Sequence, residues 1–189
     1  MSAQPSHEPT GKTSAESRVR LSQFMSPQHA NAKGNVHGGE IMKLADETGA
    51  LAAMRHARSF VVTVAMDSMT FMEPIYVGNV VTLEAEVTYV GRTSIETRVV
   101  VIAEKPLTGE TTITNVAYLV YVALDSQGRP QPVLPLIATN AEERARMEAA
   151  RERQEYRKQQ RAREQQGRQA VDAGASVSGP GGAPRGEHV

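Results

Sequence analysis

The spacing of apolar residues changes once along the chain and divides it into a helical stretch and a strand-rich stretch. From Glu40 to Ala57 small and apolar residues recur every three or four positions, which is typical of a helix that is packed closely on several sides: Ile41, Leu44, Ala45, Thr48, Gly49 and Ala52. After Arg58 the period falls to two. This alternation predicts four strands, over residues 60–72, 81–90, 94–105 and 111–124.

Short turns separate these strands, as in the segment EPIYVGN and at Gly91–Arg92. Parallel neighbours would need a crossover of about a dozen residues, so the strands are expected to form an antiparallel meander. One small-residue helix followed by such a sheet is an α+β pattern. The simplest way to bury the helix is to curl the sheet around it, which is the hotdog fold.

Composition predicts where the domain begins and ends. Residues 1–17 and 170–189 are rich in Ser, Pro, Gly and Glu, with little to bury, and are expected to be disordered. Residues 18–138 carry the dense apolar pattern of the hotdog domain. Residues 139–169 are rich in Arg, Glu, Gln and Ala and predict a charged C-terminal helix, which opens with a capping box at Thr139 or Asn140. This helix lacks a heptad pattern, which favours a solvated helix over a coiled coil.

Charge and cysteine content exclude several classes of function. The 189 residues contain no cysteine, which rules out disulfides, thiolate metal sites and a cysteine nucleophile, and fits a cytoplasmic protein. Lys plus Arg equals Asp plus Glu at 21 each, so no general basic field for nucleic acid exists. No stretch approaches the roughly 20 apolar residues of a membrane span. We therefore expect neither a nucleic-acid nor a membrane partner.

The loop before the helix and the helix itself carry the candidate chemistry. Two glycines, Gly38 and Gly39, stand at the helix entrance, where free backbone N–H groups and the helix dipole can polarise a carbonyl. Asp46 follows Gly39 by two helical turns, about 10 Å along the axis, and leans back toward that entrance. A carboxylate in a largely buried helix is costly unless it has partners or a task, so Asp46 is the candidate base or nucleophile.

Less specific readings of the same residues stay open. Glu47 is a rival carboxylate that can equally face solvent, and Asp46 itself can be a structural carboxylate. His37 could titrate near neutral pH, but capping or packing explains its position as well, so we assign it a supporting role. Three methionines at every third position, Met66, Met69 and Met72, are expected in the core or along an apolar tunnel rather than in a cofactor site.

Four segments together resemble the cytosolic acyl-CoA thioesterases of the hotdog superfamily: HANAKGNVHGGEIMKLADETGALAAMRH, VVTVAMDSMTFMEPIYVGNVV, VGRTSIETRV and TNVAYLVYVALDSQGRPQPVLP. The resemblance covers roughly residues 20–160. It implies that Asp46 activates water or attacks the thioester, that Asn31 positions the water or substrate, and that the Gly38 N–H polarises the carbonyl. It also implies coenzyme A as leaving group, with no separate cofactor and no metal.

The resemblance further implies a binding path and an assembly. The pantetheine arm would run beside the strand that contains Thr63 and Val64. The turn at Gly91, Arg92, Thr93 and Ser94 would lie near the nucleotide, where a guanidinium and hydroxyls suit phosphate. Because the family forms its site between two hotdog units, we expect a homodimer as the minimal unit and a trimer of dimers as the assembly.

Two other functions remain as alternatives on this scaffold. A non-catalytic acyl-CoA-binding sensor would be favoured by loss of the Asp46 carboxylate, which is present. A hydratase or dehydratase would need a histidine paired with Asp or Glu for carbon acid chemistry. His29 and His37 are the nearby histidines, and neither lies in such a pattern.

Overall fold

The computed structural model describes residues 11–175, with side chains described to residue 166. It divides into two compact units, Met1–Ala150 and Arg151–Val189. The first unit holds the sheet and its helix. The long helix α3 (Ala141–Ala175) begins in the first unit and continues into the second.

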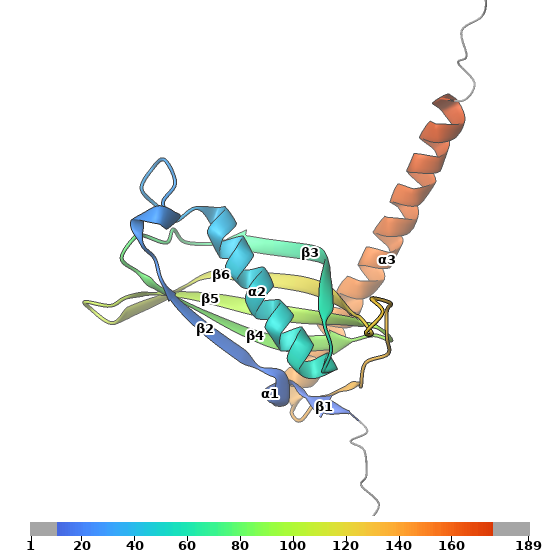
Figure 1. Cartoon of the computed structure of the whole chain (residues 1–189), viewed down its shortest axis with the longest axis horizontal. Coiled ribbons are helices and arrows are strands. Elements are labelled where there is room, and N and C mark those ends of the chain that lie inside the picture. The colour runs from blue at the N-terminus through green and yellow to red at the C-terminus, as the bar shows by residue number, and fades with distance from the viewer. Residues whose placement is uncertain (1–10, 176–189) are drawn as a thin grey trace, which may run out of the picture. The chain divides into compact units, whose positions relative to one another are not determined.

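Helix α2 (Gly38–Ala57) is the helix expected from the apolar spacing, and it begins two residues earlier than expected. The small and apolar residues that defined the pattern are buried, as are Ala53 and His56. The helix contacts all five strands of the main sheet, so the sheet curls around it (Figure 1). The expected α+β hotdog architecture is confirmed.

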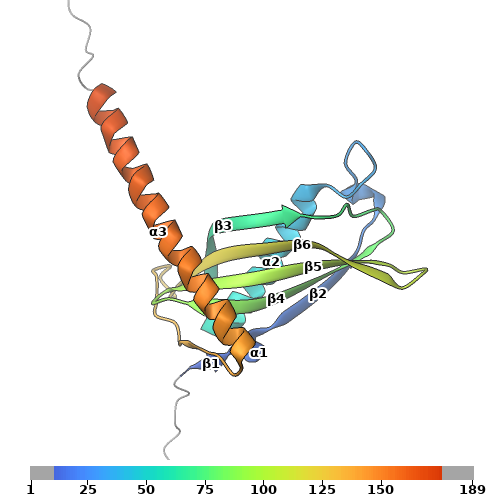
Figure 2. The same ribbon diagram turned by 180° about the vertical axis from the view of Figure 1, so that it is seen from behind.

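The main sheet is antiparallel, with strand order β2-β4-β5-β6-β3. All four strands expected from the sequence form, within one residue of the expected bounds: β3 (Val61–Phe71), β4 (Val80–Val90), β5 (Ser94–Lys105) and β6 (Glu110–Ala123). Figure 2 shows the sheet from behind, with β3 at one edge and β2 (Val19–Phe24), which the pattern did not predict, at the other.

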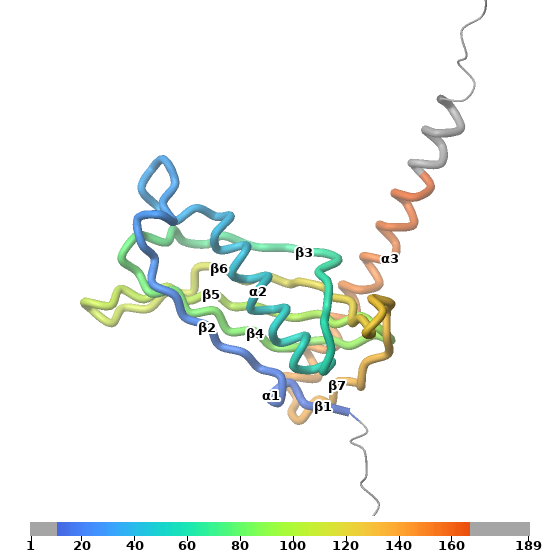
Figure 3. Tube along the Cα trace, in the orientation of Figure 1, coloured from blue at the N-terminus to red at the C-terminus, as the bar shows by residue number. Residues whose placement is uncertain are grey.

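The expected meander is therefore correct for β4, β5 and β6 and wrong for β3. Strand β3 pairs with β6, while β2 takes the place beside β4. The connection between β3 and β4 crosses from the edge strand β3 to β4, which lies next to the opposite edge strand β2 (Figure 3). Backbone hydrogen bonds hold it on the way, from Val36 N to Ile75 O (2.8 Å) and from Met25 N to Asn79 O (2.8 Å).

Residues 12–17, expected to be disordered, instead form β1 (Lys12–Thr13) and α1 (Ser14–Ser17). Strand β1 pairs in parallel with β7 (Leu136–Ile137). The buried hydroxyl of Ser14 donates to Val87 O (3.1 Å), a long-range contact that local composition could not predict. Residues 170–175, also expected to be disordered, instead continue the C-terminal helix. The predicted disorder of residues 1–10 and 176–189 lies outside the described residues.

Short elements complete the first unit. A 3-10 turn, η1 (Pro27–His29), follows β2. The start of α3 carries the expected cap, in which Asn140 Oδ1 accepts from Glu143 N (2.8 Å) and Glu143 in turn accepts from Thr139. No helix in the described part of the chain is long and apolar enough to cross a membrane.

Candidate active site

Asp46 lies half-buried on α2, and two hydroxyl groups hold its side chain. Thr63 Oγ1 donates to Asp46 Oδ1 (2.8 Å) from strand β3. The Tyr121 hydroxyl, from β6, lies 3.0 Å from Asp46 O and 3.3 Å from Asp46 Oδ1. Both side-chain contacts use the same carboxylate oxygen. Within the described residues Oδ2 accepts no hydrogen bond and no cation pairs with Asp46, so one oxygen is available for a ligand.

Tyr121 is fully buried between the sheet and α2. Burial raises the pKa of its phenol far above the ordinary value, and the nearby negative charge of Asp46 raises that pKa further. The hydroxyl therefore stays protonated at physiological pH and acts as a donor. Glu47, the rival carboxylate, is exposed on the next helical position and lies 3.9 Å from Lys43 Nζ. Of these two carboxylates, Asp46 therefore has the more suitable surroundings for a candidate base or nucleophile.

The helix entrance distinguishes its two glycines. His37 is the N-cap of α2, and its Nδ1 accepts from Gly39 N (2.9 Å). The Gly39 N–H is thereby occupied, whereas the Gly38 N–H finds no acceptor among the described residues. A Cβ added at Gly38 would lie 3.3 Å from the Phe71 ring, so the entrance is narrow on that side. His37 caps the helix, and Gly38 offers the free donor.

Asn31 lies in the loop before the helix, where it shapes a tight turn. Its Oδ1 accepts from Lys33 N (2.8 Å) and its backbone N–H donates to Asn35 O (2.7 Å). Gly34 completes the turn with a φ of +84°, which favours glycine. No hydrogen bond joins Asn31 and Asp46 in the described chain. The structure therefore brings Asp46 and Thr63 together and leaves Asn31 in a separate loop.

The residues expected along coenzyme A lie on β3 and on the β4–β5 turn. Val64 is 41% exposed at a register shift of β3 between Thr63 and Ala65. The turn is closed by Gly91 N donating to Ser94 O (2.8 Å), and it is anchored by Ala123 N donating to Thr93 O (2.9 Å). The Arg92 side chain is exposed and forms no ion pair within the described residues. Its guanidinium is free to meet an anion.

Sequence reasoning missed Tyr121, which contacts Asp46 from strand β6. Tyr121 is 75 residues away from Asp46 along the chain, and its strand reads as an ordinary alternating strand. The available signal was a tyrosine at an inward-facing position of a strand expected to cover a glycine-containing helix.

No group of three or more His, Asp or Glu side chains in the described residues forms a metal-binding cluster.

Comparison with known proteins places this arrangement in a family. The model of the thioesterase superfamily matches residues 33–110. A Bacillus subtilis protein named an uncharacterized acyl-CoA thioester hydrolase is 38% identical over 128 residues, which cover 68% of this chain and 74% of that protein.

Solved structures agree with the sequence matches. An acyl-CoA hydrolase from Staphylococcus aureus in complex with butyryl coenzyme A superposes with a TM-score of 0.78 at 30% identity, covering 85% of this chain and 98% of that one. A hexameric acyl-CoA thioesterase gives a TM-score of 0.76 at 39% identity, covering 79% and 96%. Variants of the S. aureus enzyme with an Asp, an Asn or a Thr replaced by Ala match equally well.

A helix-borne carboxylate inside a curled antiparallel sheet, together with these matches, defines a hotdog-fold hydrolase of thioesters. The chain belongs to the acyl-CoA thioester hydrolases of the thioesterase superfamily.

Proposed function

We propose that this protein hydrolyses fatty acyl-CoA to a free fatty acid and coenzyme A, with Asp46 as general base or nucleophile. The observation that carries the proposal is the state of the Asp46 carboxylate. Two hydroxyl donors fix one oxygen, the other oxygen is free, and no cation neutralises the charge within the described residues. Such a carboxylate can accept a proton or attack a carbonyl carbon.

As a general base, Asp46 takes a proton from water while the water oxygen attacks the thioester carbonyl. The carbonyl oxygen becomes an oxyanion, and the free N–H of Gly38 donates to it. The carbon–sulfur bond then breaks, and the thiolate of coenzyme A receives the proton that Asp46 had taken. As a nucleophile, Asp46 would instead attack the carbonyl carbon and form a mixed anhydride as the carbon–sulfur bond breaks and the coenzyme A thiolate leaves, to be protonated by water. Hydrolysis of the anhydride by a water molecule then gives the fatty acid and restores the Asp46 carboxylate. Asn31 orients the water or the thioester in either route.

The replaced residues of the S. aureus hydrolase support the choice of residues. Its Asn and Asp variants lie 15 residues apart, and its Asp and Thr variants lie 17 apart. Asn31 and Asp46 are also 15 residues apart (46 − 31), and Asp46 and Thr63 are 17 apart. The same three residue types at the same spacing make Thr63 part of the proposed catalytic group, beside its expected place along the pantetheine arm.

The proposed site needs a second copy of the chain. Asn31 does not reach Asp46 within the described chain. Strand β3 ends the sheet, and its outer edge, which carries exposed Val62 and Val64, pairs with no other strand among the described residues. Beside it, the open face of α2 exposes Met42 and Leu51. Pairing of two such edges would bury these side chains and bring a second helix entrance near Asp46. Hexameric relatives support a trimer of these dimers.

The proposed ligand path follows β3 toward the β4–β5 turn. The pantetheine arm would lie beside Thr63 and Val64, and the phosphates of coenzyme A near Arg92, with hydroxyls of Thr93 and Ser94 as further donors. The bound coenzyme A in the S. aureus structure supports a nucleotide ligand of this kind. The cytoplasmic location expected from the sequence stays a prediction.

Release of free thiol from a panel of acyl-CoA substrates tests the proposal. We expect turnover by the native protein and a loss of at least about 100-fold in Asp46→Asn, the usual scale for removing an acid–base group. Glu47→Gln is the matched control, since its exposed carboxylate lies one position along the same helix. Binding of acyl-CoA without thiol release would support the sensor instead, and normal turnover in Asp46→Asn would overturn the mechanism.

A further inference from the structure

Helix α2 has a notch on its buried face, one turn beyond Asp46. A Cβ added at Gly49 would lie 2.5 Å from the Tyr121 hydroxyl and 2.8 Å from Thr97 Oγ1, closer than real Cβ atoms approach. Gly49 has an ordinary helical backbone, so its glycine is not required by a positive φ. Glycine inside a helix costs about 1 kcal/mol relative to alanine. The missing side chain therefore serves the close approach of β6.

The group that occupies this notch is the Tyr121 hydroxyl. It reaches past Gly49 to Asp46, 3.0 Å from the backbone oxygen and 3.3 Å from Oδ1. One hydroxyl hydrogen shared between these two acceptors fixes the side chain relative to its own backbone. Because burial and the charge of Asp46 raise the pKa of Tyr121, the hydrogen is present throughout the physiological range.

We propose that Tyr121 is a positioning residue for the reaction, which orients the Asp46 carboxylate through the notch at Gly49 so that Oδ2 faces the thioester. This inference rests on the proposed function of Asp46. Tyr121 is fully buried, so in this proposal it does not take part in the reaction itself. It acts by holding a single rotamer of the residue that does.

Thr63 alone would hold Asp46 less firmly. Thr63 lies on the edge strand β3, next to a register shift and beside the proposed path of the pantetheine arm, so the ligand can compete for its hydroxyl. Tyr121 is fully buried on β6, in the interior of the sheet. A hydrogen bond shielded from water is stronger and better defined. We call these two hydroxyl donors to Asp46, Thr63 on the edge strand and Tyr121 in the buried part of the sheet, the clamp. Tyr121 is its more rigid member.

Tyr121→Phe tests the clamp because it removes only the hydroxyl. We expect kcat to fall about tenfold while KM for acyl-CoA stays within about twofold, since positioning affects the reacting group and not the binding of the nucleotide. The matched control is Tyr118→Phe. It makes the same deletion on the same strand, but strand alternation directs residue 118 to the opposite face of the sheet.

A double-mutant cycle with Gly49→Ala separates positioning from loss of packing. Gly49→Ala keeps every hydrogen-bonding group but pushes the Tyr121 hydroxyl away, so we expect a loss of kcat at least as large as in Tyr121→Phe. The cycle is measured with Thr97→Ala in every variant, because Thr97 Oγ1 is the second atom that the added Cβ would meet, at 2.8 Å. If both changes act through the Tyr121 hydroxyl, the double variant should then lose about as much kcat as Tyr121→Phe alone.

The outcomes distinguish this inference from the function on which it rests. Absence of thiol release by the native protein, or full activity in Asp46→Asn, would defeat the proposed function. With that function intact, full kcat in Tyr121→Phe would overturn the positioning role, as would a loss seen only in KM. A kcat loss matched by Tyr118→Phe with an equal fall in Tm, or additive losses in the cycle, would also overturn it.

Discussion

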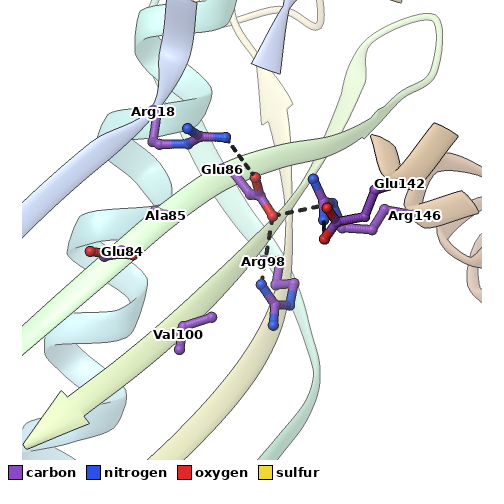
Figure 4. A pocket seen from close by; sticks show the side chains of 8 residues that line it. All are labelled: Arg18, Glu84, Ala85, Glu86, Arg98, Val100, Glu142 and Arg146. Carbon is purple, nitrogen blue, oxygen red and sulfur yellow. Dashed lines mark hydrogen bonds and ion pairs between the residues drawn. The ribbon is translucent and has the colours of Figure 1, made fainter. Parts of the chain in front are cut away.

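Asp46 and Glu86 are two carboxylates associated with opposite faces of one sheet, and their surroundings differ in kind. Asp46 accepts hydrogen bonds from two neutral hydroxyls on one carboxylate oxygen, and its other oxygen has no donor in the described part of the chain. Glu86, on the outer face of β4, meets three guanidinium groups, at 3.3 Å from Arg18, 3.6 Å from Arg98 and 3.4 Å from Arg146 (Figure 4). Only 12% of its side chain is exposed.

The difference separates a carboxylate suited to reaction from one suited to structure. The cations around Glu86 come from the link between α1 and β2, from β5 and from the first turns of α3, so the carboxylate joins β4 to three other parts of the chain. A cavity of about 300 Å³ lies beside this cluster, but its guanidinium groups are already committed to acidic partners. Hydroxyl donors, in contrast, orient Asp46 without neutralising it. Burial alone did not distinguish the two, whereas the charge of the partners does.

The largest expected effect is the recovery of turnover when two inactive variants are mixed. This experiment tests whether a residue of a second subunit completes the site around Asp46. Asn31→Ala and Asp46→Asn should each depress turnover. If the two residues meet across a dimer, equal amounts that exchange freely should recover about a quarter of native activity, since half the dimers are mixed and each carries one intact site. Native mass spectrometry checks the exchange. Exchange without recovery would place both residues in one subunit.

Arg92 extends the comparison to arginines, because it has no carboxylate partner in the described chain, unlike the three around Glu86. If Arg92 pairs with a phosphate of coenzyme A, Arg92→Ala should raise KM for acyl-CoA about tenfold. KM for an acyl-pantetheine substrate, which lacks the nucleotide, should hardly change. Equal increases for both substrates would contradict the phosphate contact.

Glu86→Gln should show the opposite pattern to Asp46→Asn. Removing the central charge leaves three arginines without their shared partner, so we expect a loss of about 1–2 kcal/mol in the free energy of unfolding, tempered by the partial exposure of those arginines. Thermal unfolding measures the loss, and kcat per folded enzyme should stay near native. A large fall in kcat at unchanged Tm would show that the outer face affects the reaction.

The smallest effect concerns His56, a buried group with a single partner. Its Nε2 lies 2.9 Å from Leu134 O, while Nδ1 has no hydrogen bond. Burial lowers the pKa of His56 below its ordinary value of 6.5. As pH falls below about 6.5 the unfolded chain binds a proton that the folded protein refuses, so stability should decrease there. Tm followed from pH 7.5 to 5.5 should show the decrease, and His56→Leu should flatten it.

Much of the fold could be predicted because it follows from local periodicity. The range of α2 and the positions of β3 to β6 depend on apolar spacing within each segment. Strand β2 was missed because it is only six residues long, and the pairing of β3 was wrong because strand neighbours along a chain need not be neighbours in a sheet.

The candidate site residues could likewise be proposed from local sequence, but their long-range contacts could not. Asp46, Asn31 and Gly38 lie within one continuous segment whose spacing points to chemistry. The role of Gly39 differs from the expected one, because the cap from His37 occupies its N–H. Tyr121 could not be assigned, since its contact with Asp46 depends on the packing of β6 against the notch at Gly49.

The edge position of β3 has a consequence for the order of folding. Thr63 pairs with Tyr121, and Asp46 hydrogen-bonds with both, so the site closes contacts that span much of the domain. The hairpins β4–β5 and β5–β6 join residues close in sequence, so their loop-closure entropy is small. Strand β3 pairs only with β6 in the main sheet, so it can pair only after β6 has formed. On a growing chain Asp46 is made early, yet its clamp closes only after the last long strand has emerged. We therefore expect enzymatic competence to appear late in folding, after most of the sheet has formed.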